Sequence, residues 1–161
     1  MRLRNPMLLL SPLMFLMAVP AFSQVEKAAM RTTGISCGTC AALSEIYLRR
    51  LPQIDKIAIS MSKESIMVSY KPGADFRPQD LREALQKTDV GIVQLQVSAR
   101  GRIQQQGGKH FFFAGKDKFV VLPPANGSHL PLDVPVMIEA MLNDKAAPME
   151  LKVMTVTPLK Q

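Results

Sequence analysis

The sequence predicts an α+β protein, in which a ferredoxin-like βαββαβ domain is followed by a small all-β domain with an OB-like barrel as its expected form. Across residues 25–98, apolar alternation and helical spacing follow one another in the order strand, helix, strand, strand, helix, strand. Past Arg100 the helical spacing disappears, and about five short alternating segments follow. We therefore expect two domains, over residues 24–99 and 100–161.

The N-terminal 23 residues have the layout of a secretory signal peptide. Arg2 and Arg4 form a basic start, Met7 to Val19 is an apolar run, and Ala21 and Ser23 are small residues before an expected cleavage after Ser23. The run has 13 residues, fewer than the roughly 20 of a membrane-spanning helix. We expect a periplasmic or secreted protein that is not an integral membrane protein after cleavage.

The charge balance is basic but modest. The chain has 20 Lys and Arg against 13 Asp and Glu, a net charge of +7. Signal removal would leave 18 basic residues against the same 13 acidic ones, a net charge of +5. Because there is no arginine-rich run and no interleaving of basic and aromatic residues, we expect no nucleic-acid partner.

Apolar alternation predicts the strands of the first domain, over residues 25–33, 54–61, 64–70 and 92–98. Residues 41–51 are expected to form a helix that Pro52 helps to end. Its inner stripe is predicted from three- and four-residue spacing as Leu43, Ile46, Tyr47 and Leu51. A second helix begins near Pro78, and its predicted inner stripe consists of Leu81, Ala84 and Leu85.

The second domain is predicted as strands over residues 102–103, 109–113, 119–122, 134–142 and 149–157, with turns over residues 104–108 and 115–117. Residues 134–142 alternate with a period of two, which favours a strand over a helix. Phe111, Phe112 and Phe113 place two rings on one strand face and one on the other, and we expect core packing to use two of them. So small a segment has a small hydrophobic core and is expected to pack against the first domain for stability.

The motif that carries chemistry is Cys37-x-x-Cys40, formed by the two cysteines of the chain. A disulfide between them would add little to the stability of the fold, because it closes almost no loop. If the helix begins near Thr39, both sulfurs lie at its N-terminal end, where free N–H groups and the helix dipole favour thiolates. Thiolates are soft ligands that select Cu(I) and similar ions.

A two-sulfur site suits Cu(I) or Hg(II) better than Zn(II). Zinc prefers four ligands, and His110 and His129 lie in the other predicted domain. Two sulfurs also leave the ion open for transfer to another thiol pair. We therefore expect a non-enzymatic metal carrier with Cys37 and Cys40 as its metal ligands, and we predict neither catalytic residues nor residues that bind an organic cofactor.

Residues 30–99 resemble the heavy-metal-associated domain of metallochaperones, metal-pumping ATPases and periplasmic mercury-binding proteins. The resemblance rests on residues 34–40, on the helix that contains Leu48 and Leu51, and on residues 54–59 and 68–72. It implies the same βαββαβ fold, metal binding by Cys37 and Cys40, copper or mercury as the metal, and a metal-accepting or metal-donating thiol protein or membrane transporter as partner.

The chain departs from this family's pattern in three places. Ile35 stands where the family usually has Met, and Gln53-Ile54 where it usually has Gly-Val. Residues 88–92 supply none of the Tyr, Phe or Lys that often lies near the metal. The apolar Ile35 is expected to preserve the packing of the loop.

Three other interpretations stay open. The same cysteine pair suits a thiol–disulfide redox protein, and residues 100–161 suit an interaction module whose docking the metal regulates. The methionines of the second domain are candidates for a secondary Cu(I) surface, although flexible filler is the favoured interpretation; they are Met137, Met141, Met149 and Met154. His110 and His129 are expected to be ordinary strand or loop residues.

Overall fold

The computed structural model describes residues 24–123, 127 and 129–160, so the predicted signal peptide lies outside the described residues. The elements in chain order are β1 (Gln24–Thr33), α1 (Gly38–Arg49), β2 (Ile54–Ser60), β3 (Ser65–Tyr70), α2 (Pro78–Gln86), β4 (Gly91–Gln106), β5 (Lys109–Ala114), β6 (Asp117–Val121), β7 (Pro135–Asn143) and β8 (Glu150–Pro158). The first six confirm the predicted βαββαβ order, and the α+β class is confirmed with it. In this part of the chain no helix is long and apolar enough to cross a membrane.

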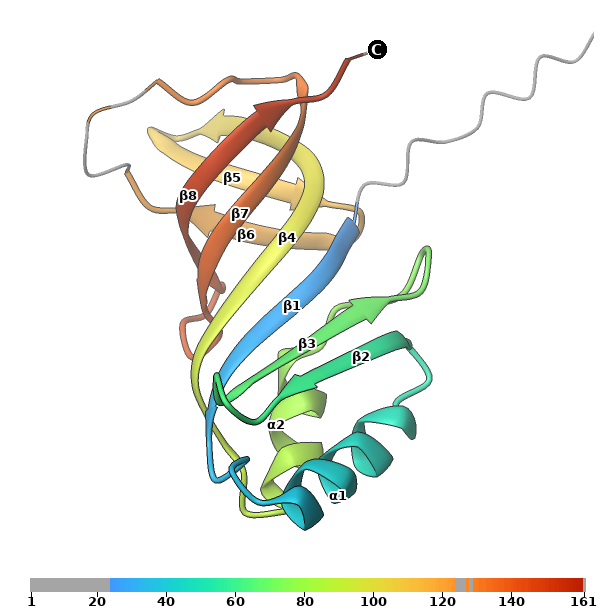
Figure 1. Ribbon diagram of the computed structural model, residues 1–161. Coiled ribbons are helices and arrows are strands. Elements are labelled where there is room, and N and C mark those ends of the chain that lie inside the picture. The colour runs from blue at the N-terminus through green and yellow to red at the C-terminus, as the bar shows by residue number, and fades with distance from the viewer. Residues whose placement is uncertain (1–23, 124–126, 128, 161) are drawn as a thin grey trace, which may run out of the picture.

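The βαββαβ region is an antiparallel sheet in the order β2-β3-β1-β4, with both helices on one face (Figure 1). In β1, Ala28 and Met30 are buried toward the helices, while Lys27 and Arg31 are exposed on the opposite face. Because successive side chains in a strand point to opposite faces, this alternation is what the sequence pattern predicts.

Strand β4 is one continuous element, whereas two separate strands and a turn over residues 104–108 were expected. The strand runs from Gly91 to Gln106, and only residues 107–108 form the turn. Gly101 allows β4 to pass close to β5, because a Cβ there would lie 2.7 Å from the Phe112 ring and would also meet the Phe113 carbonyl. The predicted domain boundary between residues 99 and 100 lies inside this strand.

The second region is a closed ring of strands in the order β4-β5-β6-β8-β7, with β7 pairing back onto β4. All of its pairings are antiparallel except β6 with β8, which joins Val120 to Glu150 and Val121 to Leu151. Strand β7 lies beside the Gln96–Arg102 part of β4 and therefore extends the ring along the first region. The OB-like barrel form of this ring stays a prediction.

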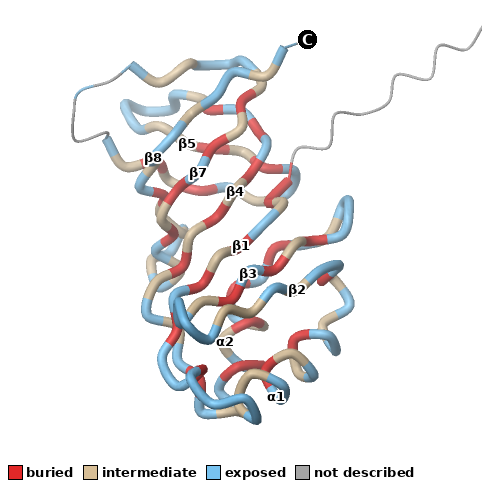
Figure 2. The backbone as a smooth tube through the Cα atoms, in the orientation of Figure 1, coloured by how far each residue is buried: buried red, intermediate tan, exposed pale blue. Residues whose placement is uncertain are grey.

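One buried cluster runs through both regions (Figure 2). Aromatic rings link them, since Phe76 after β3 contacts Tyr70 at 5.6 Å and Phe119 of β6 at 6.1 Å between ring centroids. Phe119 in turn lies 6.4 Å from Phe112. Of the three consecutive phenylalanines only Phe112 is fully buried, and its neighbours on either side are half-buried, so core packing uses one ring and not two.

The buried face of α1 differs from the predicted stripe. Leu43 and Ile46 are 42% and 46% exposed, whereas Ser44 and Leu48 are completely buried. The prediction was wrong for Leu43 and Ile46, while Tyr47 and Leu51 are half-buried against the core as expected. The helix carries apolar residues on two adjoining faces, and the small Ser44 side chain lets it approach the loop before β4. The stripe predicted for α2 is confirmed, because Leu81, Ala84 and Leu85 are all buried.

Candidate metal centre

The two cysteines lie at the start of α1, in the loop that follows β1. Cys37 is the N-cap residue, with an extended backbone (φ −98°, ψ 140°), and its Sγ accepts the backbone N–H of Cys40 at 3.0 Å. The Cys37 carbonyl accepts the Ala41 N–H at 3.0 Å, which closes the first helical turn. The expectation that both sulfurs lie at the N-terminal end of this helix is confirmed.

The structure brings the two predicted site residues together. Their Cα atoms are 5.2 Å apart, and their Sγ atoms are joined in a disulfide. Cys37 is exposed and Cys40 is half-buried, so the pair is open to solvent. Once the bond is reduced, two sulfurs in this position can reach a single ion.

The local electrostatics favour negative charge at the pair. The first turn of α1 contains no acidic residue, and its free N–H groups point toward the N-terminal end of the helix. The positive end of the helix dipole lies at the same place. Thiolates, or an anionic complex that contains two of them, are therefore favoured here.

The loop that carries Cys37 rests on the backbone of the segment before β4. Ile35 is completely buried and anchors the loop, as expected from its apolar side chain. Gly34 has φ +84°, and a Cβ at this position would lie 2.8 Å from the Asp89 carbonyl oxygen. Only glycine combines this conformation with so close an approach.

A hydrogen bond between the buried Ser44 and the half-buried Thr88 joins the same segment to α1. The Thr88 hydroxyl donates to the Leu85 carbonyl at 2.8 Å and therefore accepts from the Ser44 hydroxyl, which is 3.0 Å away. Neither residue was predicted from the sequence. The available signal was a serine among the apolar residues of a helix, since a buried hydroxyl needs a hydrogen-bond partner.

The other candidate ligands do not join the cysteines. Within residues 24–123, 127 and 129–160, no group of three or more His, Cys, Asp or Glu side chains could hold a metal ion. His110 lies half-buried in β5, and His129 is exposed in the loop before β7. The Met141 sulfur accepts a hydrogen bond from the Gln94 amide at 2.8 Å, and Met154 is 47% exposed in β8.

Comparison with known proteins finds similar solved structures, while no protein family and no curated protein matches the chain. The N-terminal domain of PacS from Synechocystis PCC6803 matches with 21% identity and a TM-score of 0.36, covering 41% of this chain and 91% of that domain. The N-terminal domain of ZntA in its apo form matches with 22% identity and a TM-score of 0.37, covering 45% and 90%. The yeast copper transporter domain Ccc2a, solved in apo and Cu(I)-loaded states, matches with 20% identity and a TM-score of 0.37, covering 42% and 94%. All three are heavy-metal-associated domains.

Proposed function

We propose that this protein is an exported, non-enzymatic carrier that holds one Cu(I) or Hg(II) ion between Cys37 and Cys40 and passes it to a thiol partner. The observation that carries the proposal is the placement of both sulfurs at one solvent-exposed point, with Cys37 capping the helix that contains Cys40. Cu(I) and Hg(II) both accept two thiolates as ligands.

The charge of the loaded site fits this position. Two thiolates and one Cu(I) carry a net charge of −1, and helix N-termini favour anions. The first turn of α1 has no acidic side chain, so no like charge lies beside the anionic complex there. A two-sulfur complex also leaves the ion accessible to an incoming thiol, so the ion can be handed on through shared sulfur ligands. The acceptor or donor is a thiol protein or a membrane transporter.

Export is proposed from the signal-peptide layout of the first 23 residues. Cleavage after Ser23 would make Gln24, which lies in β1, the first residue of the mature chain. Gln24 is 8% exposed, and its side-chain carbonyl accepts the Gly73 N–H at 2.5 Å. Cleavage there would keep all of β1 and this contact in the mature chain, and we infer a periplasmic or secreted protein.

The test is Cu(I) binding by the reduced full chain without oxygen, in competition with a chromogenic Cu(I) chelator. We expect one ion per chain, and loss of this binding in both Cys37→Ser and Cys40→Ser. Met154→Leu is the matched control, since it removes an exposed sulfur from the second region and should leave binding unchanged. A reduced protein that binds no Cu(I), or serine variants that bind as well as the original chain, would contradict the proposal.

A second candidate is a thiol–disulfide redox protein, which the Cys37–Cys40 disulfide and the exposure of Cys37 favour. In this reaction an external thiolate attacks one sulfur, the S–S bond breaks, and a mixed disulfide forms. Insulin reduction in the presence of a thiol reductant separates the two functions. A rate well above that of the reductant alone supports the redox function, and a rate equal to it supports the carrier.

A further inference from the structure

The segment between α2 and β4, together with the first residues of β4, forms the support on which the cysteine loop rests. Asp89 contacts Gly34 through its carbonyl, and Thr88 is hydrogen-bonded to Ser44 one turn after Cys40. Gly91 adds a third contact, because a Cβ there would lie 2.9 Å from the Thr33 hydroxyl. Movement of this segment therefore changes the position of the residues that hold the two cysteines.

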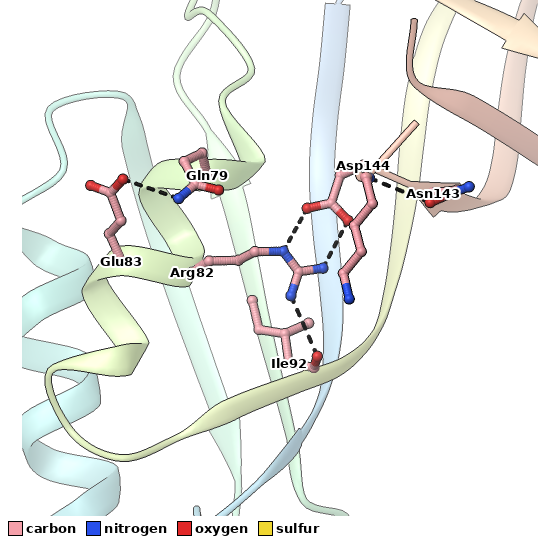
Figure 3. A network of polar contacts seen from close by, with 7 residues as sticks. Gln79, Arg82, Glu83, Ile92, Asn143 and Asp144 are labelled. Atoms are coloured by element: carbon pink, nitrogen blue, oxygen red, sulfur yellow. Dashed lines mark hydrogen bonds and ion pairs between the residues drawn. The ribbon is translucent and has the colours of Figure 1, made fainter. Parts of the chain in front are cut away.

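Arg82 holds the other side of this segment. Its Nη1 donates to the Ile92 carbonyl at 3.4 Å, at the start of β4. Its Nε and Nη2 donate to the two carboxylate oxygens of Asp144 at 2.5 and 2.8 Å. Figure 3 shows the guanidinium of Arg82 lying between Asp144 and Ile92. One side chain of α2 thus joins the support of the cysteine loop to the turn between β7 and β8.

The pair between Arg82 and Asp144 is shielded from solvent. The Asp144 side chain is 8% exposed and that of Arg82 is 27% exposed. Hydrogen bonds from Arg82 lower the pKa of Asp144, and the same bonds raise the pKa of Arg82. By contrast, the ion pair between Lys116 and Asp75, which also joins the two regions, has side chains that are 85% and 54% exposed, and exposed pairs contribute little.

The turn that presents Asp144 is itself held by the ring. The Asn143 side chain accepts the Lys145 N–H at 3.3 Å and donates to Glu150 of β8 at 3.0 Å. These hydrogen bonds tie the turn that carries Asp144 to the ends of β7 and β8.

We propose that Arg82 is a positioning residue through which the β ring holds the cysteine loop in place and slows release of the bound ion. The part of this proposal that concerns release of the ion rests on the proposed carrier function. The structural coupling between Asp144 and residues 34–41 also applies to the metal-free protein. It gives the second region a role in the site without requiring a metal ligand from the ring. Loss of the Asp144 carboxylate should loosen residues 88–91 and then the cysteine loop.

The experiment compares Asp144→Asn and Arg82→Lys in the reduced full chain. Asp144→Asn keeps the shape of the side chain and removes its charge, and Arg82→Lys keeps the charge and removes the two-pronged contact. Glu45→Gln is the control, because it breaks an exposed pair with Arg49 on α1. Amide hydrogen exchange is followed without metal, and Cu(I) transfer to a chelator is followed after loading.

We expect both variants to exchange about three-fold or more faster over residues 34–41 and 87–92, with β2 and β3 unchanged, and to release Cu(I) faster by a similar factor. The control should behave like the original chain. Exchange that rises equally in all strands would show a purely structural role and overturn the proposal, as would unchanged exchange in both variants. If the original chain fails to bind Cu(I), the carrier function is lost, while the exchange data still decide the coupling.

Discussion

Cys37 caps the helix that carries Cys40, and its sulfur accepts the Cys40 backbone N–H at 3.0 Å. The same atom therefore has a structural role in the helix and a proposed role as a metal ligand. Side chains that accept a hydrogen bond at this position stabilise a helix by about 1 kcal/mol. Substitutions at Cys37 can separate the two roles.

Under reducing conditions, Cys37→Ser should keep the cap and Cys37→Ala should lose it, because serine supplies a capping oxygen and alanine supplies no acceptor. We expect the alanine variant to be about 1 kcal/mol less stable than the serine variant in urea unfolding. Both variants should fail to bind Cu(I). Equal stability of the two variants would show that the cap contributes nothing.

Oxidation should abolish metal uptake. In the disulfide both sulfurs are bonded to each other, so neither is a thiolate, and reduction by two electrons must come before binding. Competition with a Cu(I) chelator should show one ion per reduced chain and none per oxidised chain. Equal binding by the oxidised protein would contradict the thiolate site.

Gly34→Ala should destabilise the protein by about 1–3 kcal/mol, because φ at this residue is +84° and the added Cβ would lie 2.8 Å from the Asp89 carbonyl. Gly38→Ala is the matched control, since in the described part of the chain a Cβ at Gly38 would meet no atom within 4 Å beyond its own helix and its chain neighbours. Urea unfolding should show the control to be unchanged or slightly more stable. Similar losses for both glycines would mean that the loop does not need this contact.

The observed burial on α1 predicts that truncation of Leu48 destabilises the protein more than truncation of Ile46. Leu48→Ala should cost about 2–5 kcal/mol, because Leu48 is completely buried. Ile46→Ala should stay within about 0.5 kcal/mol, because Ile46 is 46% exposed. Unfolding free energies measured by urea denaturation check this order. A reversed order would restore the stripe predicted from the sequence.

The pairing of Asp144 with Arg82 predicts a pH-dependent contribution to stability. Because Arg82 lowers the pKa of Asp144 in the folded state, the contribution is present above the unfolded pKa of about 3.9 and is lost as the pH falls through the folded value. We expect Asp144→Asn to cost about 1.5–3 kcal/mol at neutral pH, and the cost should shrink as the pH falls from about 5 toward 2.

Glu45→Gln is the control for Asp144→Asn, since the Glu45 side chain is 43% exposed in its pair with Arg49. Exposed pairs of this kind contribute about 0.5 kcal/mol or less. Thermal unfolding of the original chain, Asp144→Asn and Glu45→Gln at several pH values checks the prediction. A cost for Asp144→Asn that does not change with pH would show that the charge of Asp144 has no part in it.

Much of the first region could be predicted because its signals are local. The alternation of Ile66, Val68 and Tyr70 marks a strand, and all three residues are buried on one face of β3. The stripe of α2 was predicted correctly because a single apolar face is present. In α1 two faces are apolar, and periodicity cannot choose between Leu43 and Leu48. That choice depends on Thr88, which lies 44 residues after its partner Ser44.

The course of β4 could not be predicted for a related reason. The sequence predicts no strand between residues 98 and 102, yet in the fold Gly101 lets a continuous strand pass the ring of Phe112. A local pattern shows that a residue has no side chain, but it does not show which distant atoms use the space. The closing of the ring through Val120 and Val121 is equally non-local.

The sequence by itself determined the βαββαβ order of the first region and the position of Cys37 and Cys40 at the start of a helix. These features follow from side-chain spacing and from the chemistry of residues close together in the chain. Only the tertiary structure decided that Gly34 rests on Asp89 and that Arg82 meets Asp144, 62 residues later. The reason is that such contacts depend on how strands pair and pack across the fold, which local periodicity does not encode.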